Sequence, residues 1–149
     1  MTQDELLRLI DEAAADGRQT LDLAGKGLSK LPPEIGKLKN LKTLVLGRSV
    51  KNKFERLGNK LSVLPDEIVE LQELRTIFLH SNHFSELPEV ISELKKLRTV
   101  SLCSNKLSNL SAHVGQLTNM RFLDVSHNQL KNLPENIGVI TISGVQRRR

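Results

Sequence analysis

LRTVSLCSNKL, residues 97–107, is the stretch that decides the fold of this chain, and its form is Leu-x-x-Val-x-Leu-x-x-Asn-x-Leu. The same form, with other apolar residues at the same places, recurs at residues 74–84 and 120–130, and its first half recurs at residues 41–46. The second apolar residues of the units are spaced by 23, 33, 23 and 23 residues; they are Leu21, Leu44, Ile77, Val100 and Leu123. The spacing of 33 is the same 23-residue period with ten residues added. A constant period of this length indicates a repeat protein, in which each unit buries its apolar face against the next.

Each unit also has a recurring second half of the form Leu-Pro-x-x-Ile, followed three residues later by another aliphatic residue. This half occupies residues 31–35, 64–68, 87–91, 110–114 and 133–137, with Ser in place of Pro in the fourth copy. The alternation in the first half predicts a short strand, and stacked units place these strands in parallel. The second half predicts a short helical or 3₁₀ segment that returns on the opposite face, since Pro suits a first helical turn.

An asparagine ends four of the predicted strands, at Asn59, Asn82, Asn105 and Asn128. The backbone turns away from the sheet at these positions, and a buried bend leaves peptide groups without strand partners. We predict that the asparagine amides bond the backbone of the neighbouring turns.

The N-terminal residues 1–17 predict a helix that covers the first repeat. Thr2 and Glu5 have the spacing of a capping box, and an apolar stripe follows at Leu6, Leu9, Ile10 and Ala13,. Residues 18–142 then hold five repeats, with an insertion near residues 49–58, and residues 143–149 form a basic tail. No second cap is recognised, so we predict an open edge at residues 121–126, covered by a partner or by further chain of a longer protein.

Composition excludes some classes of protein. The single cysteine, Cys103, excludes an intramolecular disulfide, and no run approaches the eighteen apolar residues of a membrane span,. Asp4 and Glu5 stand where a secretory signal would carry positive charge, so we expect a cytoplasmic protein,. The net charge of +5 allows an acidic partner without requiring one,.

The 23-residue Leu-x-x-Leu-Pro-x-x-Ile-x-x-Leu unit resembles the leucine-rich repeat of the bacterial and Ras-associated type, and the resemblance covers residues 18–142. It implies an α/β solenoid shaped as a horseshoe. A parallel β-sheet is expected on the concave face and short helical or 3₁₀ segments on the convex face.

The opening residues 1–17, the phrase LDLAGKGL at residues 21–28 and the basic insertion resuming at residues 58–61 resemble the N-terminal repeat region of bacterial Roco proteins. In those proteins the repeats precede a Ras-like GTPase domain and a dimerising domain. This chain has no G-x-x-x-x-G-K-[ST] motif, so the resemblance does not carry GTP binding over to it,.

The predicted strands present a surface on the concave face that suits a protein or peptide partner. Arg75, Arg98 and Arg121 form a basic column, although Lys and Arg are also ordinary residues beside a leading Leu,. Phe78 is expected to be an exposed anchor, because aromatic residues dominate binding hot spots. The predicted partner-binding residues are Arg75, Phe78, His80, Arg98, Ser101, Arg121 and Asp124.

The insertion is the strongest local departure from the repeat and is a second candidate for partner contact. Its candidate residues are Lys51, Lys53, Phe54 and Arg56. Loops on a regular scaffold often carry contacts, but ten added residues also cost little, so neutral drift explains them equally.

No catalytic or metal site is predicted, and no cofactor. Asp124, Ser126 and His127 are close in sequence, but adjacent residues on a pleated strand point to opposite sides,. His80 and Cys103 are expected to be cross-strand neighbours without the third ligand that a metal site needs,. The sequence therefore predicts a non-catalytic protein- or peptide-binding module for intracellular signalling. The alternatives are a regulatory fragment of a Roco-type GTPase and, less favoured, an anion binder for nucleic acid or acidic lipid.

Overall fold

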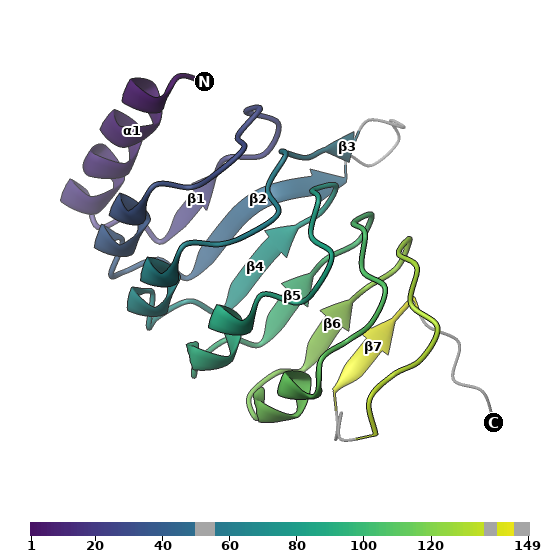
Figure 1. Ribbon diagram of the computed structural model, residues 1–149. Helices are drawn as coiled ribbons and strands as arrows, with labels where there is room; N and C mark the ends of the chain where they lie inside the picture. The colour runs from purple at the N-terminus through teal and green to yellow at the C-terminus, as the bar shows by residue number, and fades with distance from the viewer. Residues whose placement is uncertain (50–55, 136–139, 145–149) are drawn as a thin grey trace.

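The strands stack side by side, in the same direction, along one face of a solenoid (Figure 1). The computed structural model describes residues 1–49, 56–135 and 140–144. Six strands of these ranges form one parallel sheet in the order β1-β2-β4-β5-β6-β7. Their bounds are β1 Thr20–Asp22, β2 Thr43–Ser49, β4 Thr76–Leu79, β5 Thr99–Ser101, β6 Phe122–Asp124 and β7 Thr141–Ser143.

The strand register follows the repeat register predicted from the sequence. Leu44 pairs with Leu21 and Ile77, and Val100 pairs with Ile77 and Leu123. All five of these side chains are buried, so every unit contributes the same position to the interior. The predicted parallel sheet is confirmed, and with it the assignment of residues to columns that cross the strands.

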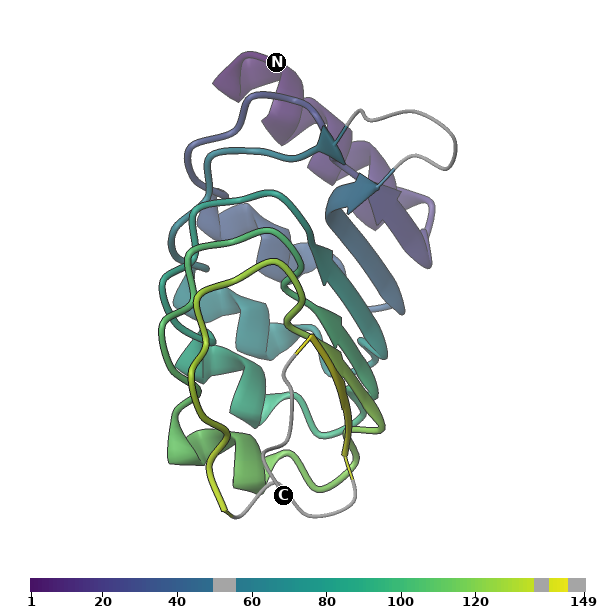
Figure 2. The ribbon, with the colours of Figure 1, turned by 90° about the vertical axis from the view of Figure 1, so that its right-hand side faces the viewer.

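Four 3₁₀ helices form the layer opposite the sheet (Figure 2). They are η1 Pro33–Lys37, η2 Asp66–Glu70, η3 Glu89–Glu93 and η4 Ala112–Gln116. Pro65 and Pro88 lie one residue before their helices rather than in the first turn. Pro32, the motif proline of the first copy, is likewise an N-cap, and the residue after it, Pro33, lies in the first turn of η1. The motif prolines therefore precede the first turn, where their fixed φ is tolerated.

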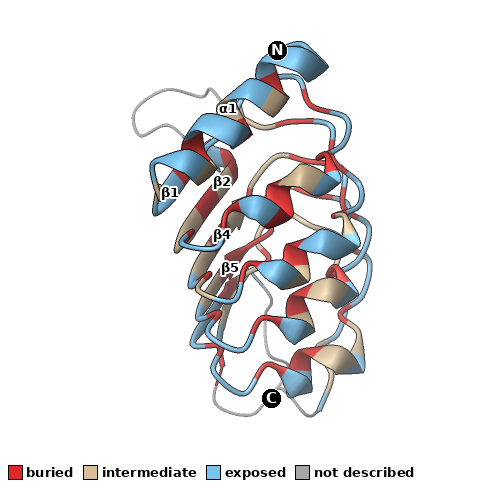
Figure 3. Cartoon of the chain, turned by 90° about the vertical axis from the view of Figure 1, so that its left-hand side faces the viewer, coloured by how far each residue is buried: buried red, intermediate tan, exposed pale blue. Residues whose placement is uncertain are grey.

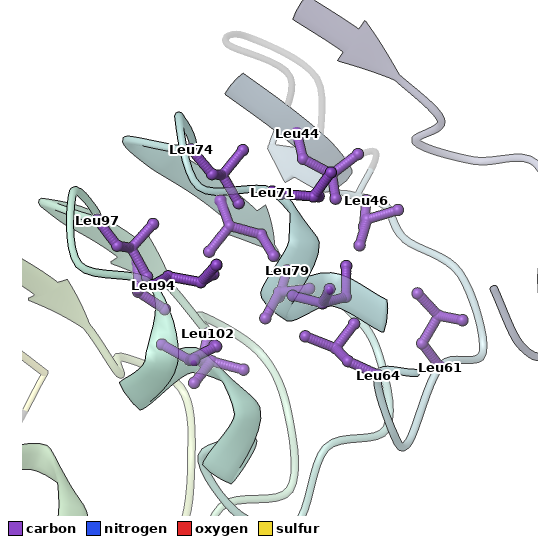
Figure 4. Packing of buried hydrophobic residues seen from close by; sticks show 14 of the residues in the cluster. Leu44, Leu46, Leu61, Leu64, Leu71, Leu74, Leu79, Leu94, Leu97 and Leu102 are labelled. Carbon is purple, nitrogen blue, oxygen red and sulfur yellow. The ribbon is translucent and has the colours of Figure 1, made fainter. Parts of the chain in front are cut away.

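The two layers enclose an aliphatic core that is continuous along the solenoid (Figure 3). Each turn of the chain contributes leucines from its strand and from its returning segment, and these leucines interdigitate with those of the next turn (Figure 4). Leu46, Leu79 and Leu102, one from each of three successive units, are fully buried. One unit alone would leave this apolar surface in water, so the repeats are stable only as a stack.

The helix α1, Gln3–Ala15, covers the N-terminal end of the core as predicted. The Thr2 hydroxyl accepts a hydrogen bond from the Glu5 amide at 3.2 Å, and the Glu5 carboxylate accepts one from the Thr2 amide at 2.9 Å. Leu6, Ile10 and Ala13 are buried against the first repeat. The capping box fixes where the helix begins, and the apolar stripe fixes which side it buries.

The insertion forms a hairpin at the end of β2. The short strand β3, Arg56–Leu57, pairs antiparallel with β2, with Arg48 opposite Leu57. Gly47 lies so close to the next repeat that a Cβ there would be 1.8 Å from the His80 carbonyl oxygen. Glycine is therefore required where β2 leaves the sheet to enter the hairpin.

The predicted open edge at residues 121–126 is wrong, because β7 pairs with β6 and becomes the last strand. Ile142 pairs with Leu123 only 19 residues later in the sequence, whereas a fixed period of 23 places Gln146 at that position. The last turn is thus shorter than the others. Ser143, predicted to open the basic tail, belongs to β7, and residues 145–149 lie outside the described residues.

None of the helices in the described parts of the chain has the length and apolar character to cross a bilayer.

Candidate functional site

Three exposed arginines lie in a row across the sheet, at the residue that precedes each of β4, β5 and β6. The Arg98 amide donates to the Arg75 carbonyl at 2.9 Å, and the Arg121 amide donates to the Arg98 carbonyl at 2.8 Å. Lys42 continues the row toward the N-terminus but is only half exposed. The backbone hydrogen bonds therefore hold the backbones of these cationic residues at the strand spacing of about 4.8 Å.

The guanidinium groups of Arg75, Arg98 and Arg121 form no hydrogen bond or ion pair with any described side chain. Lysines elsewhere are neutralised across successive units, as in the Lys39–Glu70 pair at 2.7 Å and the Lys96–Glu73 pair at 2.6 Å. A hydrogen bond from Lys39 lowers the pKa of Glu70, and one from Lys96 lowers the pKa of Glu73. The arginines of the row are thus free of direct ion pairs, although the Arg75 charge also acts through space on Glu73 and helps to lower its pKa.

A column of threonines crosses the sheet beside this row. Thr76 pairs with Thr43 and Thr99, and Phe122 takes the corresponding place between Thr99 and Thr141. Phe122 is 38% exposed. The sequence places Phe122 in this column, and its departure from threonine was the signal that could have identified it as a contact residue.

Phe78 is not the exposed anchor that we predicted. Its side chain is half-buried and its ring stacks on the His80 imidazole, with ring centroids 5.8 Å apart and an interplanar angle of 21°. The aromatic face of Phe78 is therefore partly occupied within the chain. Its position in the column was predicted correctly, but the packing of the two rings could not be read from the alternation.

His80, Ser101 and Asp124 form a polar network across β4, β5 and β6. The His80 Nε2 and Ser101 Oγ atoms are 2.5 Å apart, and Ser101 Oγ is 3.5 Å from Asp124 Oδ2. Ser101 is only 2% exposed, so it holds its neighbours in place beneath the surface and cannot be the partner contact that we predicted. The backbone keeps His80 beside Cys103, as predicted, because the Ser81 amide donates to the Cys103 carbonyl at 3.0 Å, while the His80 imidazole bonds Ser101.

The Asp124 carboxylate accepts hydrogen bonds from the residue that lies two positions later in the chain and from the neighbouring strand β7. Its Oδ1 atom accepts hydrogen bonds from the Ser126 amide at 2.9 Å, the Ser126 hydroxyl at 2.5 Å and the Ser143 hydroxyl at 3.0 Å. Burial acts to raise the pKa of Asp124, but these hydrogen bonds together lower it below its ordinary value. Asp124 is therefore a fixed negative charge whose acceptor capacity is largely satisfied.

His80 has the opposite electrostatic situation. Burial lowers the pKa of its imidazole, and the nearby Asp124 charge and the Gly47 backbone only partly offset this effect. Its Nδ1 atom is buried and has no well-formed hydrogen bond. The neutral imidazole is therefore the form that fits this site near pH 7.

The network does not have the arrangement of a hydrolase triad. Ser101 lies between His80 and Asp124, whereas the triad mechanism places the histidine between the nucleophile and the carboxylate,. Ser101 is also too deeply buried to meet a substrate. In the described ranges, no three His, Cys, Asp or Glu side chains are grouped so that they could hold a metal ion.

The insertion residues can be placed only in part. Lys51, Lys53 and Phe54 lie outside the described residues. Arg56 begins β3 and pairs through its backbone with Ser49. The short strand β3 lies at the carboxyl end of β2, away from the arginine row at the amino ends of the strands (Figure 1).

The sequence matches the family described as Leucine Rich Repeat over residues 119–140. The stacked parallel strands, the 3₁₀ segments and the asparagines at four of the turns extend the same unit beyond the matched residues. The chain folds as a leucine-rich-repeat solenoid. Such domains are generally binding modules without catalytic activity. No curated protein sequence matches this chain.

Solved leucine-rich-repeat structures have the same fold. The functional domain of InlJ from Listeria monocytogenes has a TM-score of 0.64 and 20% identity, and the match covers 89% of this chain and 25% of that one. An internalin, InlF, from the same species has a TM-score of 0.61 and 15% identity, with 85% and 33% covered. A leucine-rich-repeat protein of Leptospira interrogans has a TM-score of 0.54 and 26% identity, with 87% and 44% covered. This chain therefore spans less than half of each of these structures.

Proposed function

We propose that this chain is a non-catalytic module that binds an acidic protein or peptide on its sheet face, the concave face of the predicted horseshoe, as a recognition or scaffolding arm in intracellular signalling. The observation that carries the proposal is the row of Arg75, Arg98 and Arg121, which is exposed, held in register and free of internal ion pairs. Charges arranged in this way favour a partner of opposite sign and speed its approach.

Site-specific photo-cross-linking tests which face binds. A benzoylphenylalanine at position 76, on the sheet face, is expected to cross-link a partner in cell extract, whereas one at position 116, on the 3₁₀ face, is not. The double change Arg75→Glu and Arg98→Glu is expected to abolish the adduct. Equal cross-linking from both positions, or an adduct that survives charge reversal, contradicts a site on the arginine row.

The hairpin is a second candidate contact region in this proposal, through Lys51, Lys53, Phe54 and Arg56. Its support is that the pairing of β2 with β3 fixes its base on the scaffold,. A variant in which residues 50–55 are replaced by a two-residue Asn-Gly turn tests it, because that turn closes a hairpin of this kind. Undiminished capture of the partner by this variant restricts binding to the sheet face.

A Roco-type regulatory arm is the second candidate function. It is supported by α1 over the first repeat together with the insertion after β2, two of the three features in which the sequence resembles that region. The gene downstream of codon 149 tests this: a G-x-x-x-x-G-K-[ST] motif there supports it, and a stop codon there excludes it. The cytoplasmic location is also part of the proposal, and cell fractionation tests it.

A further inference from the structure

Phe122 is the unusual residue of the sheet face. Among the described residues, the large apolar side chains with substantial exposure are Met1, Val63 and Phe122, and of these Phe122 is the one on a strand of the sheet. All the other strands of the parallel sheet have threonine in this column, at Thr20, Thr43, Thr76, Thr99 and Thr141. Threonine satisfies an exposed strand position, so the strand itself does not require an exposed phenylalanine there.

The ring of Phe122 also has no aromatic partner within the described chain, unlike the ring of Phe78, which stacks on His80. Exposed aromatic side chains surrounded by polar groups are the residues that most often dominate binding energy. Phe122 is therefore free to accept an apolar side chain from outside.

Phe122 is held beside two unpaired cations. The Arg98 carbonyl accepts hydrogen bonds from both the Arg121 amide, at 2.8 Å, and the Phe122 amide, at 3.1 Å. This shared acceptor fixes the backbone of the aromatic residue relative to both arginines. The nearest carboxylate along β6, Asp124, accepts hydrogen bonds from Ser126 and Ser143 and, among the described residues, forms no ion pair with either arginine.

We propose that Arg98, Arg121 and Phe122 form an anchor site for a partner segment in which an apolar side chain is flanked by carboxylates. This inference rests on the proposed binding function and specifies its ligand. The apolar side chain would pack on the Phe122 ring, and the flanking carboxylates would pair with the arginines, for which bidentate geometry is available. The Phe122 ring would exclude water from the ion pairs beside it and so strengthen them.

A single-stranded nucleic acid is the competing occupant, because it also combines negative charge with flat rings. Proteins that bind such strands offer a series of aromatic platforms on which successive bases stack. Here the units on either side of Phe122 present Thr99 and Thr141. The single ring among threonines favours one apolar side chain over a run of bases.

Titration of the isotopically labelled full chain with two matched peptides tests the proposal by NMR. One probe is the blocked peptide Glu-Asp-Phe-Glu-Asp, and the other replaces its Phe by Ser. We expect the Phe peptide to bind about tenfold more tightly, as a hot-spot contact provides, and to shift the amides of residues 98–99 and 121–122.

Two variants separate the contribution of the Phe122 ring to binding from that of the two arginines. Phe122→Thr, the residue of the equivalent positions, is expected to keep the fold and remove the difference between the peptides while leaving weak, salt-sensitive binding of both. Arg98→Gln with Arg121→Gln is expected to weaken both peptides by at least about tenfold. Val63→Thr, on an exposed apolar residue outside the sheet, is the matched control and is expected to change neither affinity.

Several outcomes overturn the proposal. If Phe122→Thr folds normally by circular dichroism and still distinguishes the two peptides, the ring is not the anchor. If a ten-residue oligothymidylate binds more tightly than the Phe peptide, and Phe122→Thr loses this binding, the ligand of the site is nucleic acid and not a peptide. Failure of both peptides to bind rejects the acidic anchor alone, because photo-cross-linking from position 76 tests sheet-face binding independently.

Discussion

Asparagine side chains at the strand ends satisfy the backbone where the chain leaves the sheet. The Asn105 Oδ1 atom accepts a hydrogen bond from the Phe84 amide at 3.0 Å, and its Nδ2 atom donates to the Leu79 carbonyl at 2.9 Å and the Leu102 carbonyl at 3.0 Å. Asn59, Asn82 and Asn128 make corresponding bonds to neighbouring turns. The ladder predicted from the sequence is confirmed, and it joins adjacent repeats through their polar groups.

Removal of one such side chain is therefore expected to destabilise the whole stack. Asn105→Ala leaves buried peptide groups without partners, which is expected to cost about 2–4 kcal/mol of unfolding free energy at about 1–3 kcal/mol per unpaired group. Urea denaturation measures the change. Asn109→Ala, at an exposed position of the same repeat, is the control and is expected to be close to wild type. Equal stabilities for the two variants would show that the ladder contributes nothing.

The His80–Ser101–Asp124 network predicts that stability falls with acid. The pKa of His80 is lowered from its ordinary value of 6.5 by burial, so the unfolded chain binds a proton more readily than the folded one. Stability is then complete above about pH 6.5 and declines as the pH falls through and below that value. The pKa of Asp124 is lowered from 3.8, which adds a second loss below that pH,.

Thermal denaturation between pH 7.5 and pH 3 measures these two steps. His80→Gln is expected to remove the decline that starts near pH 6.5 and to retain the loss at lower pH. His83→Gln, at an exposed side chain, is expected to keep both. A wild-type melting temperature that does not change between pH 7.5 and pH 5 is incompatible with a histidine held neutral by burial.

At the scale of the elements, α1 substitutes for the missing neighbour of the first repeat. Ile10 is fully buried on the inner side of α1. Ile10→Ala is expected to lower the free energy of unfolding by about 2–5 kcal/mol, the usual range for large-to-small changes in a core. Denaturant unfolding measures the loss. Arg8→Ala, on the exposed side of α1, is the matched control and is expected to change stability little. Similar values for the two would mean that the helix does not seal the core.

The elements that could be predicted are those that the repeat itself determines. Alternation and a constant period place Leu44, Ile77 and Val100 in one buried column, and the structure pairs them in that order. The same reasoning fails where a unit departs from the period. It locates the insertion near residues 49–58 without predicting that β3 pairs with β2, and it misses β7 because the last turn is shortened to 19 residues.

The burial of side chains on the sheet face is the second feature that the sequence did not predict. A column assignment states which side of the strand a residue occupies, and it does not state how far its neighbours cover it. Ser101 and Phe78 share a column, yet Ser101 is buried between His80 and Asp124 while Phe78 lies half exposed on the His80 ring. These contacts depend on side-chain rotamers and on polar partners from three neighbouring strands, which an apolar pattern does not encode.

Among the described residues, α1 covers the stack at one end, and β7 is the outermost strand at the other end. Each strand between β2 and β6 has a neighbour on both sides, whereas β7 pairs only with β6 among the described strands. Ile142 in β7 is only partly buried, unlike Leu123 beside it. In a repeat protein whose contacts are mainly between neighbours, stability follows this local environment, so local opening is expected to begin at the β7 end.

Hydrogen exchange measured by mass spectrometry tests this expectation directly. Amides of β4 and β5 are expected to exchange most slowly and those of β7 fastest, with β1 protected by α1. Because Ile10→Ala weakens the helix cap, it is expected to accelerate exchange in β1 and β2 while leaving β5 and β6 almost unchanged. Uniform acceleration of every strand would instead mean that the solenoid opens only as one cooperative unit, since a local loss at α1 would then be felt equally at β6.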